Sequence, residues 1–429
     1  MRAAVVFAAA IAALPASASA GPPWSPPQPA GAVVATGGLL TTTGGARVLA
    51  GISTERSLAS PTVLATLGED GAVTARQELE IAYSRATAVG NRIVVAGSRP
   101  SKTTRGAERA PVQVALGRPG AVGSPRALPG TRGQWVSSLA GRGATIALVT
   151  ATMYNRGVEQ RSLWIRRGGR AFRRVLTFRP GSLSRETAVA VGPRGDVLLV
   201  WQARRAIRAR HFGSSGRPGR VRTLGTGVQA ALQANLASAR MEVAWKSQRV
   251  GEGDAHTPAR IVYVSAPRSG RFGPPRTAGR SSLLGTGNYV RSPGVRLVPA
   301  GDGTSLLAWT DYDGEHFRVR VAGVRAGAVG APQTVSAPGD DAVLGDLAVS
   351  PKGALVTWLT GTRGNDASGP QHVAAAFRAP GAPAFGAPEL VSDEEVASNP
   401  FAALDAAGRP LAAWTSLDQE TSAAVRASG

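Results

Sequence analysis

The sequence predicts an all-β fold, a β-propeller of about eight four-stranded antiparallel blades. Two observations predict it. A short apolar segment that ends in Trp recurs at intervals of 44 to 64 residues, and the apolar runs between turns are only four to six residues long. Runs of this length, rich in Val, Leu and Ala and bounded by Gly, Pro and Asp-Gly, are typical of strands. No long window shows a helical period.

The repeat is clearest where a Gly turn leads into an apolar strand that ends in Trp. These copies cover residues 195–201, 303–309, 353–358 and 408–414, and residues 240–245 show the same pattern without the Gly. Three weaker copies, at 47–51, 92–97 and 144–150, keep the strand and lack the Trp. We count eight units, which start near residues 37, 83, 134, 183, 228, 289, 341 and 397.

A closed ring is the arrangement that this repeat favours. One four-stranded sheet cannot bury both of its faces, so neighbouring sheets must stack, and the Trp then fills the space between them. The last unit lacks a fourth strand, and residues 31–35 form an extra strand before the first unit. If this N-terminal strand completes the last sheet, the ring has no exposed edge. Seven blades are the alternative count, and an open β-solenoid or two sandwiches are the alternative architectures.

The N-terminus indicates export. Residues 1–20 form a short basic start, an apolar run and an Ala-x-Ala site, so we expect a signal peptide that is cleaved near Ala20. The apolar run is too short for a membrane anchor. A Pro-rich leader at 21–30 and a single propeller domain at 31–429 follow. We expect a monomer without a transmembrane segment, secreted or on the exterior of the cell envelope, and without disulfides because the chain has no Cys.

Positive charge is concentrated in the middle of the chain. The formal net charge is +22, and of the 49 basic residues 46 are Arg. Residues 151–280 hold 25 basic and 6 acidic residues, whereas residues 281–429 hold 10 and 15. This asymmetry predicts a surface that faces a polyanion. A GC-rich coding bias with a solvated Arg surface is the alternative explanation.

We call twelve of the arginines of this region the basic sector. It consists of Arg166, Arg167, Arg170, Arg173, Arg174, Arg204, Arg205, Arg208, Arg210, Arg217, Arg220 and Arg222. Arg204, Arg208 and Arg210 stand at even spacings, so we expect them to project from one face of a strand. An acidic envelope polymer or a protein is the expected partner. Aromatic residues make up only 5% of the chain, which argues against a specific nucleic-acid reader.

The repeat resembles secreted bacterial β-propellers of the sialidase-like, or Asp-box, type. The resemblance covers about residues 31–429 and rests on the repeat pattern. In that family Trp stands three residues after the Gly of the Asp-box, whereas here Gly303 and Trp309 are six apart. The resemblance implies the fold, and the sialidase activity does not carry over with it.

Segments that lead into the innermost strands offer candidate ligand-binding residues. Three of these segments contain Arg, namely Arg85, Arg185 and Arg291. Two of them also contain Tyr: Tyr83 stands near Arg85, and Tyr289 stands near Arg291. Converging arginines could clamp a carboxylate or phosphate, although Arg is frequent enough here for chance to explain the pattern. Four long loops, at 98–110, 152–161, 248–260 and 361–371, are candidate recognition loops.

Catalytic and metal sites are weakly indicated. Sialidase-like chemistry would need a Tyr nucleophile, for which Tyr83 or Tyr289 could serve, with Glu186 or Asp341 nearby. Asp311, Asp313 and Glu315 could ligate calcium, but Asp-Gly at this position is also ordinary turn chemistry.

The four His are dispersed, and no cofactor is expected. The leading hypothesis is a non-catalytic binding or scaffold propeller at the cell envelope. The alternative is a glycan-active enzyme, a hydrolase or lyase with its site in the central channel.

Overall fold

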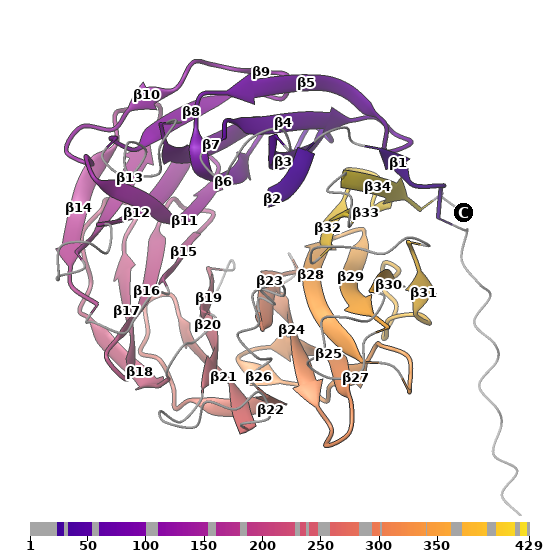
Figure 1. Ribbon diagram of the computed structural model, residues 1–429. Helices are drawn as coiled ribbons and strands as arrows, with labels where there is room; N and C mark the ends of the chain where they lie inside the picture. The colour runs from indigo at the N-terminus through magenta and orange to yellow at the C-terminus, as the bar shows by residue number, and fades with distance from the viewer. Residues whose placement is uncertain are drawn as a thin grey trace, which may run out of the picture.

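The computed structural model is a closed ring of eight antiparallel sheets around a central axis (Figure 1). It describes residues 24–29, 33–53, 60–99, 110–152, 160–180, 187–227, 232–236, 240–247, 258–282, 294–300, 303–339, 341–361, 371–392, 400–416 and 421–426. None of these residues forms a helix that is long and apolar enough to span a membrane. The all-β fold and the count of eight blades are therefore confirmed.

Each blade runs from an inner strand beside the axis to an outer strand at the rim. Blades 1 to 4 consist of β2 (Val33–Thr41), β3 (Arg47–Ser53), β4 (Thr62–Leu67) and β5 (Val73–Leu79); β6 (Ala82–Val89), β7 (Arg92–Ser98), β8 (Gln113–Arg118), β9 (Ala121–Val122) and β10 (Arg126–Ala127); β11 (Gln134–Arg142), β12 (Thr145–Thr152), β13 (Arg161–Arg167) and β14 (Arg173–Phe178); and β15 (Thr187–Val191), β16 (Val197–Ala203), β17 (Ala206–Phe212) and β18 (Arg222–Thr226). Blades 5 to 8 consist of β19 (Leu232–Asn235), β20 (Arg240–Ser247), β21 (Pro258–Pro267) and β22 (Arg276–Ser282); β23 (Val295–Pro299), β24 (Thr304–Tyr312), β25 (Phe317–Arg325), β26 (Ala328–Val329) and β27 (Gln333–Thr334); β28 (Ala342–Ser350), β29 (Gly353–Thr360), β30 (His372–Arg378) and β31 (Glu389–Leu390); and β32 (Phe401–Leu404), β33 (Pro410–Thr415), β34 (Thr421–Val425) and β1 (Gln28–Pro29).

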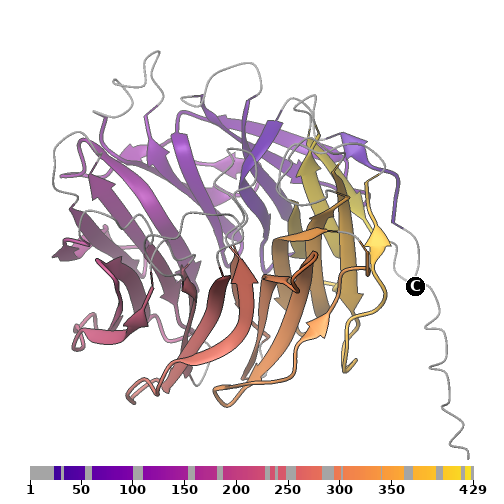
Figure 2. The ribbon, with the colours of Figure 1, turned by 60° about the horizontal axis from the view of Figure 1, so that its bottom comes forward.

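The strands run between two faces of the ring (Figure 2). One face carries the short connections from the first to the second strand and from the third to the fourth strand of each blade. We call it the turn face. The opposite face carries the connections between blades and those from the second to the third strand, and we call it the loop face.

The second strand of each blade is the most deeply buried, because neighbouring blades cover both of its faces. All seven residues of β16 are buried, for example. The repeated Trp of this strand packs toward the preceding blade: Trp245 belongs to the cluster that contains Leu198 and Val200 of blade 4. Trp245, Trp309 and Trp414 are fully buried. The predicted role of the Trp between sheets is therefore confirmed.

The missing Trp of blade 3 has a substitute on the next strand. Trp164 of β13 packs against Ala96, Val112 and Leu128 of blade 2, and its Nε1 donates a hydrogen bond of 3.1 Å to Thr150 Oγ1. The space between blades 2 and 3 is thus filled by an indole from a different strand. This explains how a repeat without the Trp signature still forms a full blade.

An N-terminal strand closes the ring, as predicted, but a different segment supplies it. Gln28 pairs with Ala423 and Pro29 with Ser422, so β1 is the outer strand of blade 8. The prediction that residues 31–35 take this place is wrong, because residues 33–35 already pair with β3 within blade 1. Pro29 lies on the outermost strand of its sheet, and edge strands are where Pro is tolerated in β-sheets.

Candidate functional site

The basic sector covers the outer strands and turns of blades 3 and 4. Nine of its twelve arginines are exposed, and Arg166, Arg167 and Arg210 are half-buried. It extends over β13 and β14 of blade 3 and over β17 and β18 of blade 4, which lie side by side in the ring (Figure 1). Arg166 and Arg222, which are 56 positions apart in the sequence, thus lie on neighbouring blades of the ring.

The described residues of these two blades carry almost no negative charge. The described parts of blades 3 and 4, residues 134–152, 160–180 and 187–227, contain sixteen Arg and one carboxylate, Asp196. Asp196 is buried and already engaged: its Oδ2 lies 3.0 Å from His211 Nε2, and its Oδ1 lies 3.4 Å from Arg268 Nη1. No other carboxylate in these described ranges is present to neutralise the exposed guanidinium groups.

Two of the predicted binding arginines also hold turns together. Arg166 Nε donates to the carbonyl of Arg170 at 2.8 Å. Arg167 Nη2 donates to the carbonyls of Gly195 and Gly213 at 3.4 and 3.3 Å, which ties blade 3 to two turns of blade 4. Burial lowers the pKa of Arg167 from its ordinary value.

Two further arginines of the sector are anchored by aromatic rings. Arg210 Nε donates to the Gly219 carbonyl at 2.9 Å, and its guanidinium lies 5.6 Å from the ring centre of Phe212. Arg174 lies over Trp164 in the same manner. These contacts restrain the side chains, and a restrained cation loses less conformational entropy when a ligand binds.

One prediction about the sector is wrong. Arg204 does not share a strand face with Arg208 and Arg210, because it lies in the tight turn between β16 and β17, where its φ of 57° is left-handed. Arg208 and Arg210 do share a face of β17. Arg208 pairs with Trp201, so it points toward blade 3, and Arg173 of β14 faces blade 4 from the other side of the same groove.

The central channel contains one of the predicted ligand-binding arginines. Arg85 lines a cavity of about 300 Å³ formed by the inner strands of blades 2 to 5, together with hydroxyl groups and the amide of Gln233. Ser137 Oγ and Thr187 Oγ1 are 2.8 Å apart across two of these strands. Tyr83 stands at a bulge of β6 with a left-handed φ of 49°.

The partners expected for Arg85 in this channel fall outside the described residues. They are Arg185, Tyr289 and Arg291, and the predicted catalytic partner Glu186 falls there too. The candidate recognition loops fall largely outside as well. Asp341, the other predicted catalytic carboxylate, accepts a hydrogen bond from the backbone N–H of Phe317 at 2.8 Å.

The three calcium candidates have separate roles at the end of β24 and in the turn after it. Asp313 Oδ1 accepts hydrogen bonds from the backbone N–H groups of Glu315 and His316 at 2.9 and 2.7 Å, as turn residues do. Asp311 Oδ2 instead lies 2.8 Å from Arg320 Nε, and Glu315 is exposed. Among the described residues, no group of three His, Asp or Glu side chains is placed to hold a metal ion.

A buried polar cluster between blades 5 and 6 was not predicted. Glu242 accepts hydrogen bonds from Tyr263 Oη at 2.6 Å, from Asn235 Nδ2 at 2.7 Å and from Ser305 Oγ at 2.5 Å. Burial, then the charge and hydrogen bond of Glu242, raises the pKa of Tyr263 well above its ordinary value.

A sequence signal for this cluster did exist. Glu242 stands three residues before Trp245, where four other copies of the repeat have Leu. A charged residue in an otherwise apolar slot of the second strand marks a site where the packing between two blades has changed.

Comparisons with known proteins show no family for this chain. No protein-family model and no curated protein matches the chain. Among solved structures, a prolyl endopeptidase is 16% identical with a TM-score of 0.46, over 91% of this chain and 54% of that one. A post-proline cleaving enzyme from Rickettsia typhi is 9% identical with a TM-score of 0.47, over 89% and 57%. Hydrazine synthase from Kuenenia stuttgartiensis is 12% identical with a TM-score of 0.45, over 76% and 92%.

The chain spans little more than half the length of the two peptidases. At these identities the likeness concerns the fold alone. The propeller fold that the Asp-box resemblance implied is shown by the eight sheets of the structure itself, and membership of the Asp-box family is not shown.

Proposed function

We propose that the protein is an exported, non-catalytic propeller that binds an acidic polymer of the cell envelope through the basic sector. The observation that carries this proposal is the charge balance of blades 3 and 4, where sixteen described arginines accompany one buried carboxylate. Guanidinium groups suit phosphate and carboxylate because each can donate two parallel hydrogen bonds to one such group.

A polymer fits the sector better than a small ligand does. The exposed arginines are distributed along β14, β17, β18 and the turns between them, and each alone offers only a weak contact in water. A chain of repeated anions can engage several of them at once, and each neutralised charge releases a counterion. The N-terminal residues 1–20 support export, which would place the protein beside such polymers.

The test compares binding to a soluble polyphosphate and a polyuronate with binding to a neutral polysaccharide at several salt concentrations. The variant Arg173→Gln/Arg208→Gln/Arg222→Gln removes three exposed charges from the sector. Arg166 and Arg167 are poorer choices because they hold turns. The control Arg76→Gln/Arg118→Gln/Arg126→Gln removes three exposed charges from blades 1 and 2.

We expect the sector variant to reduce the slope of log affinity against log salt by about two to three, since each lost contact removes about one released counterion. The control variant should leave the slope nearly unchanged. Equal effects of the two variants would mean that net charge alone attracts the polymer, and the proposal would fail. Equal binding of the neutral polysaccharide would also contradict it.

A further inference from the structure

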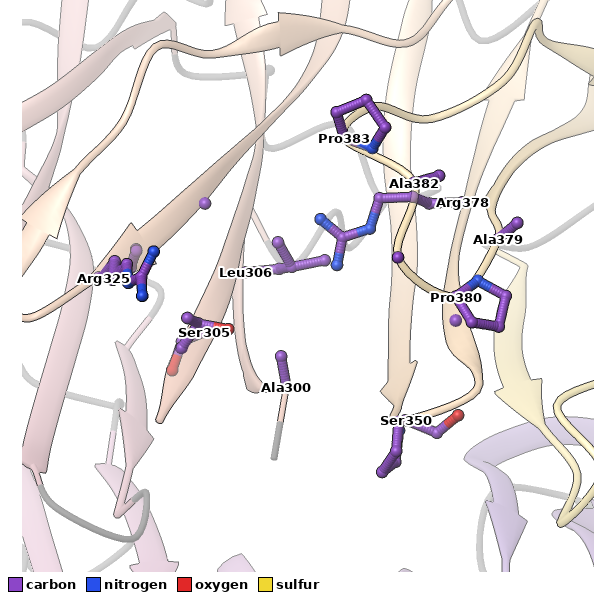
Figure 3. A pocket seen from close by; sticks show the side chains of 16 residues that line it. Ala300, Ser305, Leu306, Arg325, Ser350, Arg378, Ala379, Pro380, Ala382 and Pro383 are labelled. Atoms are coloured by element: carbon purple, nitrogen blue, oxygen red, sulfur yellow. The ribbon is translucent and has the colours of Figure 1, made fainter. Parts of the chain in front are cut away.

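A second concave site lies on the turn face between blades 6 and 7, away from the basic sector. It is a cavity of about 620 Å³. One wall consists of the start of β24 and the end of β25, and the other consists of the β28–β29 turn and the loop after β30 (Figure 3). This volume falls in the range of small-molecule sites.

The repeat itself shows how the cavity arises. Gly195 and Gly303 each stand six residues before the Trp of the repeat, so Asp196 in blade 4 and Thr304 in blade 6 are equivalent. Across the sheet, His211 pairs with Leu198 and Gly323 pairs with Leu306 in the same register. In blade 6, Thr304 thus takes the place of Asp196, and Gly323, which has no side chain, takes the place of His211.

The groove between blades 4 and 5 shows the filled form of the same place. There Asp196 contacts His211 and, from blade 5, Arg268. A Cβ placed on Gly192 would lie 2.3 Å from Asp196 Oδ1 and 2.5 Å from Arg268 Nη2, so that groove has no room. A Cβ on Gly323 would meet no atom within 4 Å. The groove between blades 6 and 7 is open where the other is closed by an internal ion pair.

The next blade still supplies a cation to the open groove. Arg378 extends from the end of β30 into the cavity toward Leu306, and Arg325 of β25 stands on the opposite wall (Figure 3). Arg378 lies 5.5 Å from the ring centre of Phe385, which restrains its position. When blades 5 and 7 are aligned on Trp245 and Trp358, Arg268 corresponds to Pro380, so Arg378 stands two residues before that position.

The remaining lining is small, apolar or hydroxylic. It includes Leu306, Pro380 and Pro383, and the hydroxyl-bearing residues Thr304 and Ser350. None of the described lining residues is acidic, so these residues offer no carboxylate to a cationic ligand. None is aromatic, so the wall offers no platform on which a sugar ring could stack.

We propose that this cavity binds a small organic oxyanion, a carboxylate or phosphate attached to an apolar body. Arg378 and Arg325 would bind the oxyanion, and the Pro, Ala and Leu wall would cover the apolar part. The site is separate from the basic sector and would take a single small molecule. The proposal for this cavity can therefore be tested independently of polymer binding by the basic sector.

The test uses benzoate and phenyl phosphate as carboxylate and phosphate probes, with benzyl alcohol as the neutral analogue. Binding to the full mature chain is measured by ligand-observed NMR and calorimetry. We expect one or both anions to bind, and benzyl alcohol to bind at least tenfold more weakly. Arg378→Gln should weaken anion binding at least tenfold, and Arg325→Gln should weaken it by a smaller factor. Arg276→Gln, on the outer strand of blade 5, is the control and should leave it unchanged.

The variant Thr304→Asp/Gly323→His introduces the residues of blade 4 and should abolish anion binding by closing the groove. Its thermal midpoint is compared with that of the parent, and the arginine variants decide the question if it does not fold. Binding of both anions no tighter than that of benzyl alcohol would overturn the proposal. So would anion binding that survives Arg378→Gln and Arg325→Gln unchanged.

Discussion

Lys246 offers a quantitative test of how the blades pack. It follows Trp245 on β20, is 7% exposed, and no described residue forms an ion pair or hydrogen bond with its amino group. Burial lowers its pKa from 10.5 to about 8. In the unfolded chain the pKa returns to its ordinary value, so a shift of this size corresponds to about 3 kcal/mol of lost stability while both states carry the proton.

The sign of the pH dependence follows from this shift. Below pH 8 the native and unfolded states are both protonated, and the full penalty applies. Between pH 8 and 10.5 the unfolded state binds a proton that the native state does not, so the free energy of unfolding rises with pH. The titration of Tyr263 acts in the opposite direction, but only above pH 10, because its folded pKa is raised.

The experiment is urea unfolding at pH 7 and pH 9.5 for the parent, Lys246→Met and Lys352→Met. Met has nearly the volume of Lys and no charge, and blade 7 already has Leu359 at the equivalent position. We expect the parent to gain about 2 kcal/mol more than Lys246→Met between the two pH values. Lys352 is exposed, so its substitution should change little. Identical pH dependence of the parent and Lys246→Met would refute the reasoning.

Three further predictions concern the core, the polar cluster and a turn. Trp309→Ala should lower the free energy of unfolding by about 3–5 kcal/mol, measured by urea unfolding, because a fully buried indole leaves a cavity between blades 5 and 6. Tyr263→Phe should lower the free energy of unfolding by about 1–3 kcal/mol, because Glu242 loses a hydrogen-bond donor. The double variant Glu242→Leu/Tyr263→Phe should lower it by less than the sum of the two single changes. Additive effects would contradict a coupled cluster. Although partial burial acts the other way, hydrogen bonds from His316, Glu315 and Arg318 lower the pKa of Asp313 to about 2. The contribution of Asp313 to the free energy of unfolding is therefore present above pH 4 and is lost as the pH falls toward 2. Acid unfolding of Asp313→Asn should begin at a pH closer to neutral than that of the parent, and an unchanged acid transition would count against this reasoning.

The sequence predicted the ring because its strongest signal is periodic. Gly turns and Trp at fixed spacing identify second strands, and the four-strand unit follows from the length of the repeat. The closing strand was harder to predict, since Gln28 and Pro29 have no apolar pattern and pair only through the backbone. Two-residue outer strands such as β26 and β27 leave no pattern either.

The candidate sites were predicted only in part, because side-chain partners depend on contacts between distant residues. Composition located the basic sector on blades 3 and 4. It could not show that Arg167 bridges to Gly195 and Gly213, or that Arg204 occupies a turn. The cavity between blades 6 and 7 is invisible in a single unit, because it arises from what Thr304 and Gly323 lack relative to another copy.

Departures from the repeat are therefore more informative than the repeat itself. In one slot Leu becomes Glu242, and a buried polar cluster replaces apolar packing between blades 5 and 6. In another slot Asp196 becomes Thr304, and a closed ion pair becomes an open groove. Each blade contacts only its neighbours, so the cost of such a change stays local while the remaining interfaces keep the ring closed. This locality is what allows a stable propeller to leave one interface open for a ligand and to cover another with arginine.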